Sequence, residues 1–376
     1  MEPVILAPHS IDRNEKPPVN KLTEKFNAVV SSDGMSNTVK PTVTHKAPFN
    51  HSYHIRLAWI MGNKDALHKA LSDFRSLRDK KTIVDLDDEL EAYKSLETLN
   101  DDLRNELRYE FAGYFGRMIE ITSFEARDRL FQSYIEYGVE SIAFEGCEID
   151  DVSGVIFKLG KITSLKHLNL RRLNLKGVDL DNLPKGLVSL ILSYCEIEND
   201  DLKYLPPNLD ELILLGNEKL TDRALDLVPK KVKILSLCRC TGITGTGLKN
   251  LGPQIEALFL DGCSLISDKE ISEIPKSVKV LSVSGCNLTD EGLLGIPREV
   301  EELVLWQCSL ITDKGIAFLP PKLQLLNIAH TLIEGTGFSR LPSTLKDMYH
   351  SIGSFKGVEE IPHFNGTIRL FYIGEL

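Results

Sequence analysis

One pattern of hydrophobic and polar positions recurs along the chain from about residue 139 to its end, in units of 22 to 24 residues. Each unit contains the form L-x-x-L-x-L-x-x-C/N, as in LDELILLGN (209–217), VKVLSVSGC (278–286) and VEELVLWQC (300–308). Alternation with a period of two predicts a short strand with its leucine-type residues on one side and the residue between them on the other.

The segment after each strand reads I-T-D-x-G-L and ends near a proline. A Thr or Ser at its start predicts the N-cap of a short helical turn, because such side chains accept hydrogen bonds from free N–H groups. The proline that follows lacks an N–H and ends the helix. Nine prolines fall in this phase, at positions 184, 206, 229, 253, 275, 297, 320, 342 and 362.

One such unit cannot bury its apolar side alone, so the units must stack, with their strands side by side in a parallel sheet. The sequence therefore predicts an α/β solenoid of ten to eleven repeats over residues 139–376. The final full repeat departs from the pattern, because His350 occupies an inward position that is apolar in the other repeats.

The repeat pattern resembles the cysteine-containing leucine-rich repeats found behind F-boxes in ubiquitin-ligase adaptors. The joints LPKGL, LPPNL, LPPKL and LPSTL are also similar to those of leucine-rich-repeat effectors secreted by intracellular bacteria. The resemblance implies a horseshoe-shaped leucine-rich-repeat solenoid and a non-catalytic protein that binds a protein partner. It leaves two roles open: a translocated bacterial effector that binds a host protein or another effector, and a substrate adaptor of a ubiquitin ligase.

The N-terminal third lacks the repeat. Residues 1–52 are rich in Pro, Asn, Ser, Thr and Lys, and we expect them to be disordered or extended. Residues 53–138 have helical spacing of apolar residues, and a capping box at Thr122 and Glu125 precedes a last helix. We interpret 53–138 as a helical domain that caps the first repeat. An F-box or a catalytic module is the alternative, but neither a Leu-Pro-x-Glu opening nor a catalytic motif occurs there, so we expect no enzyme and no cofactor.

The cysteines have a structural interpretation. Six of the seven share one register after the strand, and Asn217 stands at the same position of its repeat; the six are Cys147, Cys195, Cys240, Cys263, Cys286 and Cys308. We expect buried, reduced thiols and no metal site, since the spacing does not match a zinc site. Free thiols indicate a reducing, cytoplasmic compartment, which includes the host cytosol for a secreted bacterial protein. Cys238 lies outside the register. It is expected on the concave surface as an inert thiol, with a reactive thiol as the alternative.

The outward positions of successive strands form rows on the predicted concave face. Large apolar side chains in these rows indicate an interaction surface, although parallel strands favour such residues in any case. Trp306 is the candidate central anchor, because Trp, Tyr and Arg dominate binding energies. The other candidate partner-binding residues are Ile191, Tyr194, Ile213, Arg239, Phe259, Val304, His330 and Tyr349.

The net charge of the chain limits the kinds of partner that it can bind. The chain carries 54 acidic and 44 basic residues, a net charge of −10, which argues against nucleic acid as the main partner. No apolar run approaches the roughly 18 residues that a membrane span needs, and the N-terminus does not resemble a secretory signal. We expect a monomer without a membrane span.

Overall fold

The computed structural model describes residues 112–113, 115–120, 127–144, 147–351 and 367–371, the last as backbone alone. The expected disordered segment 1–52, most of the helical region 53–138 and its capping box at 122–125 lie outside the described residues. The domain boundaries at 52 and 138 therefore remain predictions.

Two compact units make up the described part of the chain. One runs up to Cys195 and includes residues 204–209, and the other comprises residues 196–203 and the chain from Asp210 on. The elements of the first unit are α6 (Arg127–Glu136), β1 (Ser141–Ala143), α7 (Val152–Leu159), β2 (His167–Asn169), η2 (Leu180–Asn182) and β3 (Ser189–Ile191).

The second unit repeats a short strand and a short helical turn. Its strands are β4 (Glu211–Ile213), β5 (Ile234–Ser236), β6 (Ala257–Phe259), β7 (Val280–Ser282), β8 (Glu302–Val304), β9 (Leu325–Asn327), β10 (Asp347–Ser351) and β11 (Thr367–Phe371). The helical turns are α8 (Arg223–Leu227), η4 (Leu248–Asn250), α9 (Asp268–Ile271), η5 (Glu291–Gly295), η6 (Gly315–Phe318) and η7 (Phe338–Arg340), and a further turn, η3 (Asn199–Tyr204), precedes β4 in the chain.

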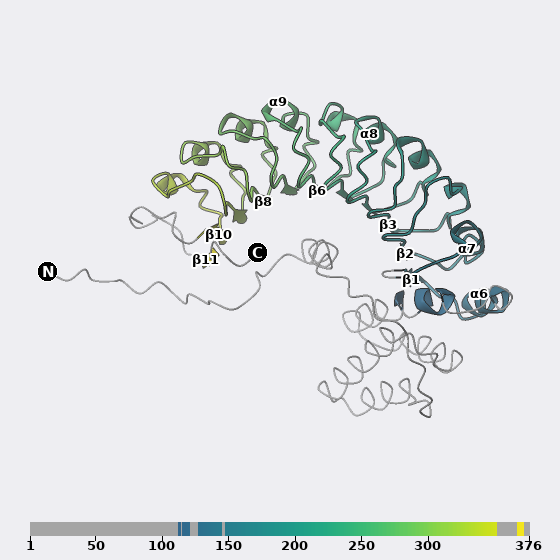
Figure 1. Cartoon of the computed structure of the whole chain (residues 1–376). Coiled ribbons are helices and arrows are strands. Elements are labelled where there is room, and N and C mark those ends of the chain that lie inside the picture. Colours follow the sequence, from purple (N-terminus) through teal and green to yellow (C-terminus); the bar gives the residue numbers. More distant parts are fainter. Residues whose placement is uncertain (1–111, 114, 121–126, 145–146, 352–366, 372–376) are drawn as a thin grey trace, which may run out of the picture. The chain divides into compact units, whose positions relative to one another are not determined.

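Neighbouring strands within each unit pair in parallel and in register. In the second unit Ile213, Ser236, Phe259, Ser282, Val304, Asn327 and Tyr349 form one continuous row of Cα partners. In the first unit Asn169 is the partner of Ile191. The strands of the second unit lie on the inner side of its curve and the helical turns on the outer side (Figure 1). The predicted strand positions and this central row are confirmed.

The core lies between the strands and the helical turns. The inward residues Leu235, in β5, and Leu237, directly after β5, have no exposed surface, and neither do Leu258 and Leu260 one repeat later. Burying one leucine side chain contributes roughly 1.5–3 kcal/mol, so the stacking of repeats supplies most of the driving force. No helix in the described ranges is both long and apolar enough to cross a membrane.

The hydroxyls of the T-D-x-G-L segment have a second partner in addition to the one predicted. Ser267 caps a helix as expected, in a capping box with Glu270 at the start of α9. The hydroxyls of Thr244, Thr289 and Thr312 each accept the N–H of the residue two positions later, at 3.4, 3.2 and 3.3 Å. Each also donates to an Asp carboxylate of the preceding repeat, at 2.5, 2.6 and 2.6 Å. A hydroxyl can donate and accept at the same time, so the local contact and the contact between repeats coexist.

In the same segment, the Asp accepts the hydrogen bonds from the next repeat, and the Gly leaves space for the Asp of the previous repeat. Asp290 accepts both the N–H of Thr312, at 2.7 Å, and its hydroxyl. A Cβ atom on Gly315 would lie 2.5 Å from Oδ1 of Asp290, and one on Gly292 would lie 2.2 Å from Oδ1 of Asp268. Glycine is therefore required where the Asp of the previous repeat enters, and the motif encodes contact between repeats.

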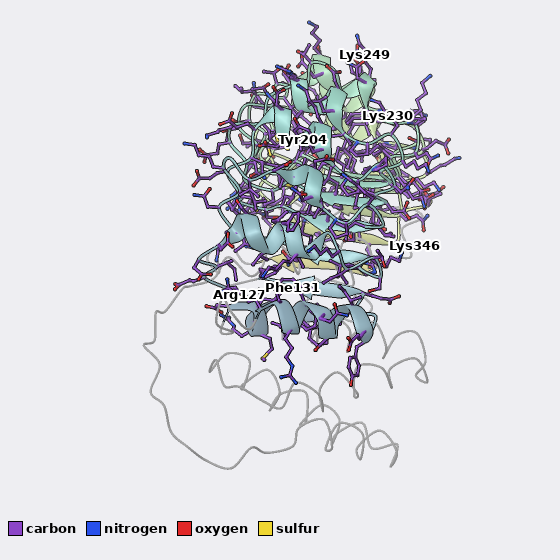
Figure 2. All side chains as sticks on the ribbon, turned by 90° about the vertical axis from the view of Figure 1, so that its right-hand side faces the viewer. Arg127, Phe131, Tyr204, Lys230, Lys249 and Lys346 are labelled. Carbon is purple, nitrogen blue, oxygen red and sulfur yellow. The ribbon has the colours of Figure 1, made fainter. Side chains whose placement is uncertain are left out.

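Helix α6 packs at the start of the first unit. Its buried residues are Arg127, Leu130, Phe131 and Tyr134, and Figure 2 shows Arg127 and Phe131 on this helix. The Tyr134 hydroxyl donates to the carbonyl oxygen of Phe115 at 2.8 Å, and Arg127 forms an ion pair with Asp150 at 2.7 Å. The first contact joins α6 to the segment before it, and the ion pair joins α6 to the first repeat, as expected for a cap.

Candidate protein-binding face

The structure separates the predicted binding residues by their exposure. Trp306, Val304 and His330 in the second unit are half-buried, and Arg239 is exposed. In the first unit Ile191 and Tyr194 are half-buried. These six side chains retain surface that a partner could contact.

Three of the predicted apolar contacts are not exposed. Phe259 has no exposed surface, and Ile213 and Tyr349 each expose 2%. The expectation that they form an exposed patch is wrong, because the alternation along a strand fixes only the direction of a side chain and not how far other atoms cover it. These residues contribute to packing in the described structure.

Trp306 and His330 form an aromatic pair. Their ring centroids lie 5.8 Å apart and the ring planes meet at 88°, an edge-to-face arrangement. The backbone is fixed on both sides, because the N–H of His330 donates to Oγ of Ser351 at 2.7 Å and the carbonyl of Trp306 accepts from Gly285 at 2.8 Å. The pair is thus held in place before any partner arrives.

The turn after each strand places one residue in the left-handed region. This position lies three residues after that of the central row, and φ there lies between 53° and 73° at Arg172, Tyr194, Gly216, Arg239, Gly262, Gly285, Gln307 and His330. Glycine adopts this backbone freely, whereas other residues lose about 1–2 kcal/mol. Sequence reasoning missed this geometry, although three glycines in one register position were the available signal.

Arg239 packs along this row. Its N–H donates to the carbonyl oxygen of Asp261 at 2.7 Å. A Cβ atom on Gly262 would lie 3.3 Å from the Cγ of Arg239, so the stem of the arginine runs over this glycine. The residue as a whole is exposed.

A polar cluster centres on Asp261. Its carboxylate accepts hydrogen bonds from the Ser282 hydroxyl at 2.5 Å, the Ser284 N–H at 2.8 Å and the Cys238 thiol at 3.2 Å. Cys238 is only 2% exposed, so the expected surface thiol is in fact buried. Burial, followed by the negative charge of Asp261, raises the pKa of the Cys238 thiol, which disfavours the reactive thiolate.

The cysteines of the common register form a ladder between repeats. The thiols of Cys195, Cys240, Cys263, Cys286 and Cys308 donate to a carbonyl oxygen of the preceding repeat at 3.1 to 3.4 Å. Burial raises the pKa of Cys195, Cys240, Cys263 and Cys308 to about 12. The predicted burial, without disulfide bonds, is confirmed for these five cysteines, whereas Cys147 is half-buried.

The histidines do not share a site. Both ring nitrogens of His350 lie 3.0 Å from carbonyl oxygens, those of Ser351 and Ile333, and burial lowers its pKa despite these contacts. His330 faces Trp306 instead. Within the described ranges no three His, Cys, Asp or Glu side chains gather as metal ligands would.

Comparison with known families agrees with this geometry. The family model described as "Leucine Rich repeat" matches residues 275–296, one complete unit that ends near the proline of the next joint. The chain has a leucine-rich-repeat fold. The α/β solenoid expected from the sequence is thereby confirmed, and such a fold is typical of protein-interaction scaffolds.

Three solved leucine-rich-repeat and related structures are similar at low identity. LegL7 of Legionella pneumophila is 19% identical, with a TM-score of 0.38 over 51% of this chain and 78% of its own. Internalin InlF of Listeria monocytogenes is 16% identical, with a TM-score of 0.41 over 63% and 77%. A chain of the yeast Rad7–Elc1 complex is 16% identical, with a TM-score of 0.42 over 88% and 99%. No curated protein matches the sequence.

Proposed function

We propose that this protein is a non-catalytic interaction module that binds a protein partner on its concave face, with Trp306 as the central anchor. The observation that carries the proposal is the Trp306–His330 pair, a half-buried indole held edge-to-face against a second ring. Binding energy at interfaces concentrates in a few such residues, and Trp is among the commonest of them.

The surroundings of Trp306 suit an anchor. Val304 lies two residues earlier on the same side of β8, and Asn327 is its register partner on β9. Ala329, which is almost fully buried, follows β9 at the position that Trp306 has after β8, and its side chain is small. The combination of one large ring, one β-branched residue and polar neighbours provides an apolar contact with a polar rim.

We propose further that the partner is a host protein or another effector, met after export from a bacterium into a host cell. This part of the proposal is supported by the LPxxL joints that the repeats share with secreted effectors. The reduced thiols of the repeat ladder are compatible with a cytosolic destination.

Affinity capture from a host-cell lysate, followed by titration of the purified captured protein, tests the proposal. Trp306→Ala is expected to weaken binding by about 2 kcal/mol, close to 30-fold in Kd, because the indole surface is lost. Leu310→Ala is the matched control: Leu310 is a large apolar residue, 49% exposed, in the turn beyond Cys308 of the same repeat.

Thermal unfolding of both variants establishes that each keeps its fold. Loss of affinity with Trp306→Ala and unchanged affinity with Leu310→Ala supports the anchor role. An equal Kd for the Trp306→Ala protein and the wild type would contradict it.

A further inference from the structure

The carboxylate of Asp261 carries a charge that the described residues do not neutralise. Asp261 is half-buried, and it accepts hydrogen bonds from three neutral groups: the Ser282 hydroxyl, the Ser284 N–H and the Cys238 thiol. It forms no ion pair with another described residue. Hydrogen bonds from neutral donors orient a carboxylate but leave its negative charge in place. A negative charge therefore remains on the concave face, in the turn after β6.

One oxygen of this carboxylate can accept a further hydrogen bond. Oδ1 accepts two, from Ser282 and Ser284, whereas Oδ2 accepts from Cys238 alone among the described residues, at 3.2 Å. An ionised carboxylate has about four acceptor positions on its two oxygens, and a thiol is a weak donor. Oδ2 therefore has capacity for a stronger donor, and ammonium and guanidinium groups form the strongest hydrogen bonds to carboxylates.

The other charged residues of this face are also mainly acidic. The outward positions are the first and third residues of each strand from β4 to β10 and the residues two and three positions after the third. Among the described residues at these positions, the only Lys or Arg is Arg239, and the carboxylates are Glu211, Asp261, Glu302 and Asp347. Opposite charges across an interface favour binding and like charges disfavour it, so this face favours basic segments over acidic ones.

Asp261 and Trp306 belong to one row on this face. Asp261, Ser284 and Trp306 each lie two residues after a row of register partners in β6, β7 and β8. The N–H of Gly262 donates to the carbonyl oxygen of Ser284, and that of Gly285 to the carbonyl oxygen of Trp306, both at 2.8 Å, so the three turns are stacked. Neighbouring parallel strands are about 4.8 Å apart, which places Asp261 and Trp306 roughly 10 Å from each other.

Small residues separate these two side chains. Ser284 lies between them in the row and is 7% exposed. A Cβ atom on Gly285, the next residue, would meet no atom within 4 Å beyond its chain neighbours. An extended segment advances about 3.3 Å per residue, so about three residues span the distance. A partner segment that contacts Trp306 with one side chain can therefore reach Asp261 with another.

We propose that Asp261 binds a lysine or arginine side chain of the protein partner, about three residues in sequence from the apolar residue that contacts Trp306. This inference rests on the proposed function, since it assumes that a protein segment binds the concave face beside Trp306. The cationic group donates to Oδ2 of Asp261, and the acidic residues around it disfavour acidic segments. Trp306 anchors the segment, and Asp261 determines its charge and its register.

The experiment uses the full chain and a displayed library of random 12-residue peptides. Peptides selected at about 0.15 M salt, where distant surface charges are screened, are sequenced and their affinities measured with synthetic copies. We expect enrichment in Lys and Arg, at about three residues from a large apolar residue.

Asp261→Asn removes the charge and keeps the shape of the side chain. Its Oδ1 can still accept from Ser282 and Ser284, and thermal unfolding of the variant checks that the fold is kept. We expect about a tenfold or greater loss of affinity for the selected peptides, because a hydrogen bond between charged groups is lost. Glu256→Gln is the matched control: it removes one negative charge from an exposed residue directly before β6, and the peptides should bind it as they bind the wild type.

A double-mutant cycle separates direct contact from an effect on the structure. The basic residue of a selected peptide is replaced by glutamine, and both peptides are titrated with the wild type and with Asp261→Asn. If the two groups touch, the replacement costs much less affinity in the Asp261→Asn protein than in the wild type. Equal losses in both proteins would show that Asp261 acts only on the structure of the turn, and would overturn the inference.

The remaining outcomes distinguish the inference from the proposed function. Selected peptides that lack basic residues, or that bind Asp261→Asn as tightly as the wild type, overturn the inference. If those peptides nevertheless lose affinity with Trp306→Ala, the proposed function stands. Basic peptides that depend on Asp261 but not on Trp306 contradict Trp306 as the anchor. If no peptide is enriched, or none depends on either residue, both proposals are contradicted.

Discussion

Six non-glycine residues in the described part of the chain have the left-handed backbone that favours glycine, and Gln307 is suited to measuring the cost of this geometry. It is exposed, with φ 60°, and it follows Trp306. Gln307→Gly is expected to stabilise the protein by up to about 1 kcal/mol, since the relief of strain exceeds the entropy that glycine loses on folding. Urea unfolding measures the change in the free energy of unfolding. Gln307→Ala keeps the Cβ atom and should give no gain, and a gain from alanine as large as that from glycine would refute this explanation.

The reactivity of each cysteine with a thiol reagent measures how far that residue is buried. At pH 8 a thiol with a pKa of about 12, such as Cys263 or Cys308, is almost entirely protonated and therefore unreactive. We expect a thiol-reactive chromophore to label the half-buried Cys147 in the folded protein and to spare the six buried cysteines. All seven should react in denaturant. Rapid labelling of Cys238 in the native protein would contradict its buried contact with Asp261.

At the residue scale, the sequence predicted types of position better than degrees of exposure. The register of the cysteines predicted the burial of all but the half-buried Cys147, because one residue type recurred at one place after six of the strands. Phe259 and Cys238 were predicted to face outward and are buried, since periodicity carries no information on neighbouring coverage. The left-handed position of His330 escaped prediction because its own residue type gives no signal of positive φ.

Contacts between helical turns depend on the Asp of the T-D-x-G-L segment, which gives a prediction at the scale of elements. Asp290→Ala removes the acceptor for both the N–H and the hydroxyl of Thr312, and should destabilise the protein by about 1–3 kcal/mol in urea unfolding. Glu291→Ala, an exposed acidic neighbour in the same turn, should change stability by less than about 0.5 kcal/mol.

A double-mutant cycle sharpens this test. Gly315→Ala places a methyl group against the Asp290 carboxylate, and this clash is absent when Asp290 is already alanine. The two substitutions should therefore be non-additive, with the double variant more stable than the sum of the single changes implies. Additive effects would show that the carboxylate and the glycine do not share this space.

The sequence predicted where strands and helical turns occur, because the period of two and the proline joints mark them directly. It predicted that the hydroxyls of Thr289 and Thr312 accept a local N–H group, but not that they donate to an Asp, since a cap is inferred from local neighbours. That Asp is 21 or 22 positions away, one repeat earlier. Contacts between repeats therefore cannot be inferred from the sequence of a single unit, because they form only when successive units are stacked.

For the whole molecule, the parallel order of strands follows from short connections between similar units, and was predicted for this reason. The role of the N-terminal helices was predicted as a cap, and in the described part α6 contacts the first repeat through the ion pairs Arg127–Asp150 and Asp128–Lys158. The C-terminal end of the repeats also needs to be covered, because the last strand of a sheet leaves a row of unpaired backbone groups.

Strand β11 covers that edge of β10, with five residue pairs from Asp347–Thr367 to Ser351–Phe371. A chain that stops after Ser351 should expose the edge of β10 and associate in a concentration-dependent way, since exposed strand edges pair with other chains. Light scattering after size-exclusion chromatography measures the mass at several protein concentrations. A chain that stops after Phe371 keeps β11 and is the matched control, expected to remain a monomer like the full chain. If the shorter chain is also monomeric at every concentration, β11 does not protect the edge, and the monomeric state must depend on the charge of the protein instead.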